Sequence, residues 1–413
     1  MQFRDLQKQY EVLKPEMDAA MIAVASGAHF ISGEQVKTLE ERLAAYVGRK
    51  HCITCGNGTD ALELCMMAWG VGPGDAVFVP DFTFFASGEA VSTMGGNIAE
   101  NSGGLRGLKY GTTKKYVMGL EVLTETGEIM KTGACGRGCE YGYNLTELLV
   151  ASEGTLALTS KAVLKLVTPP KASKAMMAIF SEVKRASQAV AGIIAAHVVP
   201  CTLEFMDNAT INYVEDYVNI GLPRDAAAIL LIEVDGHPAQ VADEAVSVEK
   251  VLKDSGALEV VVAKDAAEKT RIWEARRVAI PALARCRPTL MLEDATVPRS
   301  KIPAMLEALD KIAARHHVTI GTFGHAGDGN LHPSILCDKR DREEFSRVER
   351  AVDDLFNVAL ELGGTLSGEH GIGTSKKKWL ELETSKGTLE YMRRMRSAFD
   401  PKKLLNASKI VSL

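Results

Sequence analysis

Residues 322–332 read TFGHAGDGNLH and carry the densest chemical signal in this chain. Two histidines, His325 and His332, stand seven residues apart across a glycine-rich turn. Because glycine adopts backbone conformations that other residues avoid, such a turn lets the chain curl until both imidazoles face one point. A second glycine-rich segment, SGEHGIG at 367–373, offers a carboxylate at Glu369 and another imidazole at His370.

These side chains are of the kinds that bind divalent metals. Two histidines and one glutamate form a three-ligand set with open coordination positions, which suits Zn²⁺, Mn²⁺ or Fe²⁺. The alternative is that the two segments are unrelated loops whose histidines are merely hydrogen-bonded. The spacing alone favours neither interpretation, and it predicts His325, His332 and Glu369 as candidate ligands.

The composition is that of an ordinary globular protein. Of 413 residues, 46% are hydrophobic and 24% charged, with a formal net charge of -5. This length predicts two or three domains, and the lack of a basic excess argues against nucleic acid as a partner. No run reaches the roughly 18 apolar residues of a membrane helix, and the first residues do not resemble a signal peptide. We therefore expect a cytoplasmic protein without a transmembrane segment.

The eight cysteines are scattered along the chain, which argues against a disulfide framework. Four of them could form a zinc or iron–sulfur site, and the alternative is separate reduced thiols. These four are Cys52, Cys55, Cys135 and Cys139.

Strand and helix patterns extend outward from the histidine segment. Strand-like runs lie at 116–123, 128–132, 156–167, 229–234 and 259–263, and helical spacing marks 241–255 and 266–285. This order predicts an α+β domain built on an antiparallel sheet. Residues 1–94 differ, because predicted helices at 18–25 and 34–47 precede a strand, glycine turn, helix and second strand, which form a βαβ unit.

The front of the chain carries a weaker chemical signal. Residues 58–60, Gly-Thr-Asp, open a helix after a strand, where free backbone N–H groups and the helix dipole suit a phosphate. Phe82, Phe84 and Phe85 follow the next strand and could stack on a flat ring. The alternative is a tight turn with core aromatics.

Residues 1–95 resemble the start of the sugar-nucleotide aminotransferases, pyridoxal-phosphate enzymes of fold type I. The matching motifs are FISG at 30–33, GTDAL at 58–62, GPGD at 72–75 and PDFTF at 80–84. The resemblance implies a truncated α/β fragment in which Gly58 and Thr59 would hold the cofactor phosphate. The family's later aspartate and Schiff-base lysine have no counterpart here, so we do not expect bound pyridoxal phosphate.

From Gly96 onward the chain resembles the FAD-linked subunit of glycolate oxidase and its relatives, the D-lactate and D-2-hydroxyglutarate dehydrogenases. The matching motifs are GNIAENSGG at 96–104, KYG at 109–111, SEGTL at 152–156, Trp273-x-x-Arg276, EDATVP at 293–298, the two segments with His325 and Glu369, and DPKKLLN at 400–406. The resemblance implies the second half of a vanillyl-alcohol-oxidase-type FAD-binding domain at 96–170. It also implies a ferredoxin-like, antiparallel-sheet substrate domain with C-terminal helices at 171–413.

The resemblance implies roles for single residues at the histidine segment. His325, His332 and Glu369 would hold the metal, which would chelate the carboxylate and hydroxyl of a 2-hydroxy acid. His370 would accept the hydroxyl proton while the Cα hydride passes to FAD. Asn330 would help to orient substrate or ligands.

Other residues would contact the substrate carboxylate or the flavin. Arg276 would clamp the carboxylate with its planar guanidinium, and the alternative is a surface salt bridge on a charge-rich helix. The residues that would approach FAD are Asn101, Gly103, Gly104, Tyr110, Gly111, Gly154, Thr155 and Asn406.

Family members carry the first half of the FAD domain before this region, and here the aminotransferase-like fragment stands in its place. A junction therefore lies near Gly95, and the sequence leaves open whether it is a natural fusion or an artefact. We expect FAD-dependent oxidation of a small D-2-hydroxy acid, of the glycolate or D-lactate class, impaired by the loss of that half-domain. The alternatives are a pyridoxal-phosphate sugar aminotransferase and a non-catalytic fusion that binds only metal and hydroxy acid. The resemblance further implies a homo- or hetero-oligomer and an electron-accepting partner subunit or electron-transfer flavoprotein.

Overall fold

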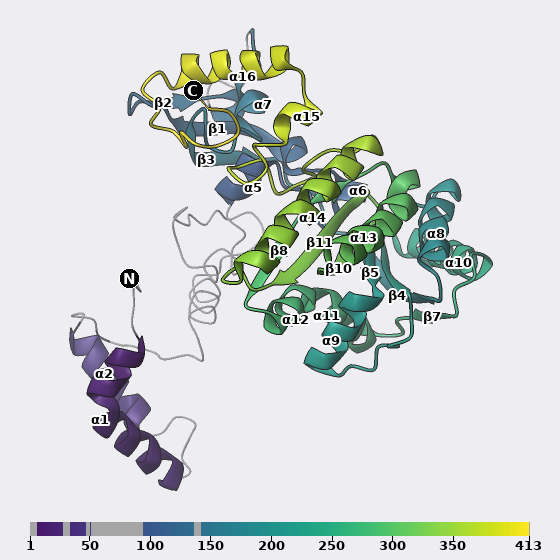
Figure 1. The fold of residues 1–413 in the computed structure, drawn as a ribbon, viewed down its shortest axis with the longest axis horizontal. Helices are drawn as coiled ribbons and strands as arrows, with labels where there is room; N and C mark the ends of the chain where they lie inside the picture. The colour runs from purple at the N-terminus through teal and green to yellow at the C-terminus, as the bar shows by residue number, and fades with distance from the viewer. Residues whose placement is uncertain (1–5, 28–33, 47–49, 51–93, 136–141, 413) are drawn as a thin grey trace. The chain divides into compact units, whose positions relative to one another are not determined.

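The computed structural model describes residues 6–27, 34–46, 50, 94–135 and 142–412. Contacts within the chain divide it into two compact units, Met1–Ser92 and Thr93–Leu413. Among its described residues, the first unit holds the helices α1 at Leu6–Gly27 and α2 at Glu34–Tyr46 (Figure 1). The helix predicted at 18–25 is therefore longer than expected, and the one predicted at 34–47 is confirmed.

Several predictions for the front of the chain lie outside the described residues. They comprise the βαβ unit, the phosphate turn at 58–60, the three phenylalanines and the four-cysteine cluster, of which only the backbone of Cys135 is described.

A small antiparallel sheet opens the second unit. Its strands, in the order β2-β1-β3, are β1 at Val117–Leu123, β2 at Ile129–Lys131 and β3 at Leu158–Leu164. The helices α5 at Met94–Glu100 and α7 at Leu145–Leu149 belong to the same core, which buries Ile98, Leu120 and Val122. The three strands predicted here are confirmed, each with slightly shorter bounds.

The main sheet has eight strands, and its paired neighbours all run antiparallel, as the sequence predicted. The order is β7-β4-β6-β5-β10-β11-β8, and β9 pairs with β11. The bounds are β4 Ala172–Phe180, β5 Thr202–Asp207, β6 Ala228–Gly236, β7 Glu259–Val262, β8 Thr289–Leu292, β9 Ala295–Thr296, β10 Thr319–His325 and β11 Asn330–Cys337.

One half of this sheet has the ferredoxin-like connectivity that the resemblance implied. Strands β4 and β5 are joined through α8 at Val183–Ala195, and β6 and β7 through α10 at Pro238–Asp254. The four strands lie side by side in the order β7-β4-β6-β5, which is the β-α-β-β-α-β arrangement. Strands β10, β11 and β8 extend the sheet beyond β5.

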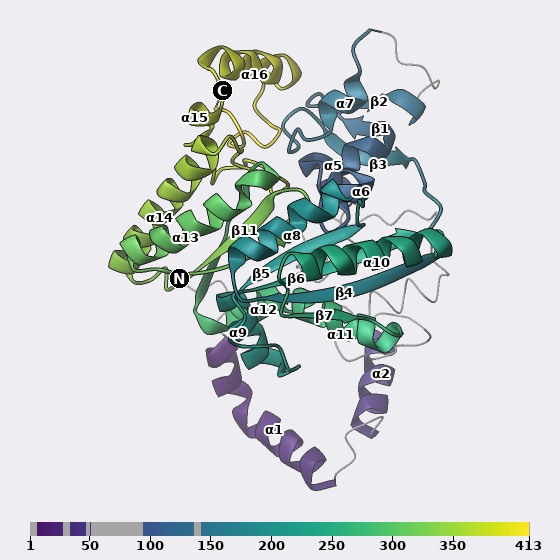
Figure 2. The same ribbon diagram turned by 90° about the vertical axis from the view of Figure 1, so that its right-hand side faces the viewer.

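Helices cover both faces of the main sheet (Figure 2). One face packs against α8, α10, α13 at Ile302–His316 and α14 at Arg342–Glu361. The other packs against α9 at Asn208–Val218, α11 at Ala266–Arg277 and α12 at Ala279–Cys286. Successive residues of β6 from Ala228 to Asp235 are accordingly all buried, because alternating side chains enter two different cores.

The sequence predicted one helix over 266–285, and the structure instead has α11 and α12 with a break at Val278. Pro281 gives the physical reason. In a continuous helix its ring would clash with the carbonyl of Arg277, and it has no N–H to donate. The chain therefore ends one helix and starts another, with Pro281 in the first turn of α12.

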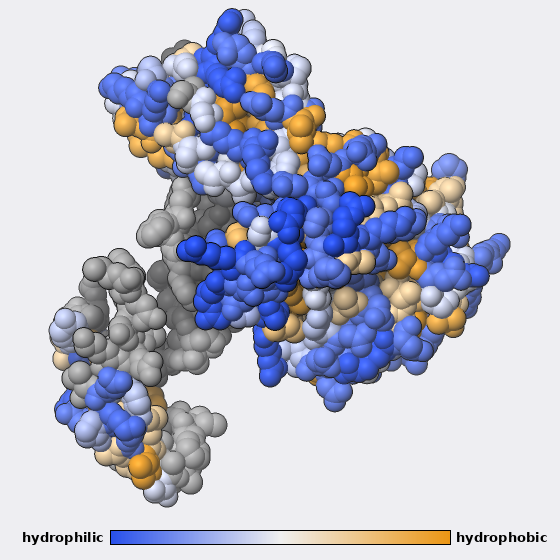
Figure 3. Space-filling model, viewed as in Figure 1, coloured by the Kyte–Doolittle hydropathy of each residue, from blue (hydrophilic) through white to orange (hydrophobic). Residues whose placement is uncertain are grey.

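Two helices, α15 at Leu380–Glu383 and α16 at Lys386–Phe399, close the chain. The remaining short elements are α6 at Gly107–Tyr110 and the 3-10 turns Thr113–Tyr116, Gly133–Cys135 and Arg299–Lys301. No helix among the described residues is long and apolar enough to cross a membrane. On the face seen in Figure 3, hydrophilic residues dominate over α14, and hydrophobic residues gather in smaller patches.

Candidate functional site

The two candidate histidines lie on a β-hairpin. Strands β10 and β11 pair with His325 opposite Asn330 and Phe323 opposite His332. Gly324 has φ +155° and Gly329 has φ +80°, and a Cβ on either would press on backbone of the hairpin or of Val297. These glycines let the turn close tightly, so both imidazoles reach the sheet face that α11 covers.

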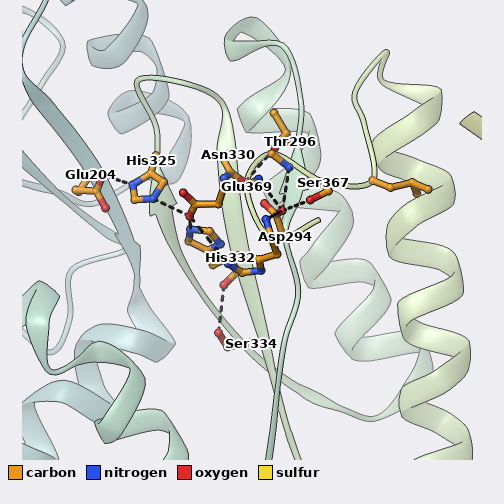
Figure 4. Close-up of polar contacts among 12 residues, drawn as sticks. Glu204, Asp294, Thr296, His325, Asn330, His332, Ser334, Ser367 and Glu369 are labelled. Atoms are coloured by element: carbon orange, nitrogen blue, oxygen red, sulfur yellow. Dashed lines mark hydrogen bonds and ion pairs between the residues drawn. The ribbon is translucent and has the colours of Figure 1, made fainter. Parts of the chain in front are cut away.

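Glu369 meets both histidines at one oxygen. Its Oε1 lies 3.2 Å from Nε2 of His325 and 3.2 Å from Nε2 of His332 (Figure 4). The two imidazoles are perpendicular, with ring centroids 5.0 Å apart. One ligand atom from each of the three residues falls within 4.8 Å of the others, and both histidines are buried. The residues proposed from sequence as ligands therefore converge on one point.

Glu204 supports the site from β5. Its Oε1 lies 2.6 Å from Nδ1 of His325, and its Oε2 accepts from Nε of Arg276 at 2.6 Å. A carboxylate at Nδ1 fixes the proton on that nitrogen and leaves the Nε2 lone pair for a cation, as at many histidine metal sites. Glu204 is fully buried, so its charge depends on these two partners.

The pKa values of these groups reflect the same pairing. Burial lowers the pKa of His325, but the carboxylates of Glu204 and Glu369 outweigh it and raise the pKa to about 10. Burial also opposes ionisation of Glu369, yet its hydrogen bonds to His325 and His332 hold its pKa well below the ordinary value. Without a cation, a protonated imidazole thus balances the buried carboxylates, and a cation would replace that proton.

His370 stacks on His332 with centroids 5.0 Å apart and an interplanar angle of 12°. Burial lowers the pKa of His370, so this imidazole is neutral near pH 7 and able to accept a proton. Its side chain is one-third exposed, whereas His332 is nearly inaccessible. Of the histidines gathered here, His370 is the one open to a substrate.

Asn330 and Arg276 flank the cluster. The Asn330 Oδ1 accepts from Thr296 Oγ1 at 3.0 Å, and its side chain lies against Gly368, just before Glu369. The Arg276 guanidinium carbon lies 4.6 Å from the centroid of the Phe323 ring. The salt bridge of Arg276 is therefore buried beside the histidines, not the surface pair that the sequence left as an alternative. Among the described residues, its two terminal nitrogens have no hydrogen-bond partner, which leaves them for an anion.

Only some of the residues expected to approach FAD lie beside the candidate metal ligands. A Cβ on Gly103 would stand 3.8 Å from Oε2 of Glu369, and one on Gly104 would stand 3.9 Å from it. Backbone without side chains thus faces the candidate metal site. Asn101 lies just before them with φ 53°, and its Oδ1 accepts from the backbone of Lys114. Gly111 has φ +83° and faces Lys115 instead.

The other expected FAD residues are engaged within the chain. The Tyr110 hydroxyl donates to Asp235 at 2.7 Å, and Thr155 Oγ1 donates to the Ser152 carbonyl at 2.7 Å. Asn406 donates to the carbonyl of Glu153 at 2.6 Å, and its amide packs against Gly154. Asn406 therefore joins the C-terminal segment to the turn before β3 at Glu153 and Gly154, and any contact of these residues with FAD would fall to their remaining atoms.

A cavity of about 470 Å³ opens beside Glu369. Its lining includes Glu100, Asn101, Ser367, Glu369 and Ile372. Burial and then the charge of Glu153 raise the pKa of Glu100 to about 7. The site is therefore adjoined by space that is large enough for a small acid or part of a larger ligand.

The arrangement fits both groups that the resemblance implies. Two imidazole nitrogens and a carboxylate oxygen converge, and Glu204 fixes one ring from behind, which suits a divalent cation. The side-chain-free backbone at Gly103 and Gly104 offers a cradle for a flat ring next to that cation.

Sequence reasoning missed two residues, Glu204 and Asp294. Both are fully buried carboxylates. The signal for Glu204 was its place in the strand-like run TLEFMD at 202–207. A glutamate between apolar strand residues is expected to be buried, and a buried charge requires a partner. Asp294 stood in the motif EDATVP without an assigned role.

Three protein families match different parts of the chain. The family of FAD linked oxidases, C-terminal domain, matches residues 169–410, and the FAD binding domain matches residues 82–133. The DegT/DnrJ/EryC1/StrS aminotransferase family matches residues 11–99. Both predicted resemblances are therefore confirmed, whereas the pyridoxal-phosphate fold expected for the front stays a prediction.

Individual relatives agree with this division. The chain is 48% identical over 320 residues to the glycolate oxidase subunit GlcD of Bacillus subtilis (strain 168), which covers 78% of this chain and 68% of the relative. It is 32% identical over 333 residues to the D-lactate dehydrogenase of Anaerostipes hadrus, with 78% and 70% covered. The chain thus spans about two thirds of the length of these relatives.

Among solved structures, the 4-ethylphenol oxidase from Gulosibacter chungangensis superposes with a TM-score of 0.65. The match covers 86% of this chain and 75% of the oxidase at 13% sequence identity. At that identity the likeness shows the fold alone, which is the vanillyl-alcohol-oxidase type with antiparallel sheets and helices.

Proposed function

The chain belongs to the FAD-linked oxidase family, and we propose that it oxidises a small D-2-hydroxy acid of the glycolate or D-lactate class to the 2-oxo acid. One observation carries this proposal: His325, His332 and Glu369 converge at 3.2 Å with the exposed imidazole of His370 beside them. A chelating hydroxy acid needs such a cation site next to a base.

A cation held by His325, His332 and Glu369 would supply Lewis acidity at the substrate hydroxyl and carboxylate, and bound FAD would supply the capacity to accept a hydride. His370 accepts the hydroxyl proton at its exposed imidazole, because its lowered pKa keeps it neutral. The terminal nitrogens of Arg276 hold the substrate carboxylate, while its Nε stays fixed on Glu204. Asn330 keeps the loop before Glu369 in place through its contact with Gly368.

We propose that the front of the chain weakens FAD binding without abolishing the metal site. All three ligands and Glu204 lie between residues 204 and 370, within the second unit. The FAD-binding match, by contrast, spans only residues 82–133. A protein that keeps metal and hydroxy acid but does not retain FAD is therefore the second candidate.

The electron acceptor is also part of the proposal. The Bacillus subtilis relative is named a subunit of glycolate oxidase. We propose that this chain likewise passes electrons to a partner subunit or an electron-transfer flavoprotein, in a homo- or hetero-oligomer.

Anaerobic flavin reduction tests the reaction directly. The purified chain, supplied with FAD and Zn²⁺, is mixed with glycolate or D-lactate, and flavin absorbance near 450 nm is followed. We expect bleaching by the wild type and a rate lower by about 10²–10⁴-fold for His370→Gln, since the proton acceptor is lost. His316→Gln is the matched control, because His316 pairs with Asp354 away from the site.

Two other outcomes are informative. A wild type that binds FAD and Zn²⁺ but shows no bleaching with either acid contradicts the proposed reaction. A wild type that binds Zn²⁺ and acid in calorimetry, but retains no FAD, establishes the second candidate.

A further inference from the structure

Asp294 organises the loop that carries Glu369 and His370. Its Oδ2 accepts hydrogen bonds from Ser367 Oγ at 2.7 Å and from the backbone N–H groups of Gly368, Glu369 and His370 at 2.9 to 3.0 Å (Figure 4). Four donors on one buried carboxylate oxygen leave this loop little freedom, since release of any donor would leave a buried charge less well paired. One side chain thus fixes both the proposed ligand and the proposed base.

The other oxygen of Asp294 has no partner among the described residues, and neither has Nδ1 of His332. Both atoms are buried. One atom each from Asp294, His332 and His370 forms a group within 4.8 Å. If Nε2 of His332 binds a cation, its Nδ1 carries a proton that must be donated to an acceptor.

A second cation and a water molecule are the two species that could link these atoms. A second cation would require the proton to leave Nδ1 of His332, and the Lys376 ammonium already lies 3.5 Å from Asp294 Oδ2. Both facts disfavour further positive charge. A water molecule can accept from Nδ1–H of His332 and donate to Asp294 Oδ1, the two buried atoms that lack partners among the described residues.

We propose that Asp294 is a positioning residue of the metal centre, which fixes the loop of Glu369 and His370 through one carboxylate oxygen and holds a buried water against His332 through the other. This inference rests on the proposed function, because it presumes that His325, His332 and Glu369 bind a divalent cation.

Zn²⁺ titration of the full chain by calorimetry tests the inference without using activity. In Asp294→Asn the side chain keeps its size but loses its charge, and its NH₂ must face either the four loop donors or the proposed water. We expect Zn²⁺ affinity to fall by about 10–100-fold. Glu293→Gln is the matched control, because Glu293 is its buried neighbour and accepts no hydrogen bond from the loop. The control should keep wild-type affinity within about threefold.

The outcomes separate this inference from the proposed function. Equal Zn²⁺ affinity in Asp294→Asn and Glu293→Gln overturns the inference while leaving the metal site intact. A wild type that binds no Zn²⁺ overturns both. If Asp294→Asn does not fold, Ser367→Ala decides, because it removes one of the four donors. A loss of about threefold to tenfold then supports the inference, and unchanged affinity contradicts it.

A crystal structure of the Zn²⁺-loaded chain tests the water itself. Anomalous scattering at the zinc edge should give one peak among His325, His332 and Glu369. Electron density without anomalous signal should lie between Asp294 Oδ1 and His332 Nδ1. A second anomalous peak at that position, or no density there, would overturn the assignment of a water.

Discussion

Glu100 places an ionisable group with a shifted pKa beside the cavity at Glu369, and it makes the stability of the protein pH-dependent. Burial and Glu153 raise its pKa to about 7, against about 4.3 for a free glutamate. A raised pKa means that the folded state holds the proton more tightly. The stabilisation is therefore complete below about pH 4.3 and is lost as the pH rises through 7.

Replacing Glu100 by Gln should remove that loss. At pH 8 we expect Glu100→Gln to be more stable than wild type by about 1 kcal/mol, a figure reduced because the side chain is half-buried. At pH 4 the two proteins should unfold alike. Urea unfolding at both pH values measures the difference, with Glu128→Gln, which is exposed, as control. A difference of equal size at both pH values would show that ionisation of Glu100 is not its cause.

At the residue scale, the sequence predicted those site residues that lie close together along the chain. His325 and His332 share one hairpin, and Glu369 and His370 share one loop, so residue type and spacing were sufficient to select them as candidates. Glu204 and Asp294 were not predicted, because their roles arise from tertiary contacts. Glu204 reaches His325 across 121 residues, and Asp294 reaches His370 across 76. No local pattern encodes such separations.

At the scale of elements, existence and type were predicted better than boundaries. The strands expected at 229–234 and 259–263 and the helix at 241–255 are present as β6, β7 and α10. Their apolar patterns are strong because β6 is buried in the cores on both faces of the sheet, whereas α10 and β7 pack against one of these cores. The prediction of one helix over 266–285 was wrong because it followed the apolar spacing and ignored Pro281. The backbone geometry of proline causes the break between α11 and α12.

Arg396 on α16 gives a test of how one element holds the C-terminus. Its guanidinium is buried and donates to four backbone carbonyls, those of Leu405, Asn406, Lys409 and Val411. Arg396→Met would leave these acceptors unpaired, so we expect a loss of about 3 kcal/mol in the free energy of unfolding. Arg394→Met is the control, because Arg394 is exposed and should change stability by less than about 0.5 kcal/mol.

Urea unfolding and limited proteolysis of the tail after Leu405 measure this effect. Similar stability of the two arginine variants would show that the buried guanidinium contributes no more than an exposed one. Faster cleavage in Arg396→Met alone would show that α16 anchors the tail.

At the scale of the whole molecule, the two sheets of the second unit are covered by other elements to different extents. The main sheet is covered by helices on both faces, whereas the small sheet has one modest core. Several large hydrophobic side chains of the small sheet are exposed, namely Met118, Leu123, Ile129, Leu158 and Val163. These side chains lie outside the core that Ile98, Leu120 and Val122 form, so the small sheet buries less apolar surface than the main sheet does.

This difference in coverage predicts that the small sheet is locally less stable than the main sheet. A three-stranded sheet with one small core needs less free energy to open than one buried on both faces. In hydrogen exchange at neutral pH, amides of β3 should exchange at least about tenfold faster than those of β6, although both are hydrogen-bonded in antiparallel ladders.

Two sets of contacts oppose independent opening of the small sheet. Glu153 accepts from the backbone of Ile372 and Gly373, and Asp235 binds Lys109 and Tyr110. If they couple the two sheets into one cooperative unit, β3 and β6 will exchange at equal rates. The small sheet and the main sheet, which carries the candidate ligands His325 and His332, would then unfold together. Faster exchange in β3 would show that the small sheet opens while the main sheet, which carries His325 and His332, stays folded.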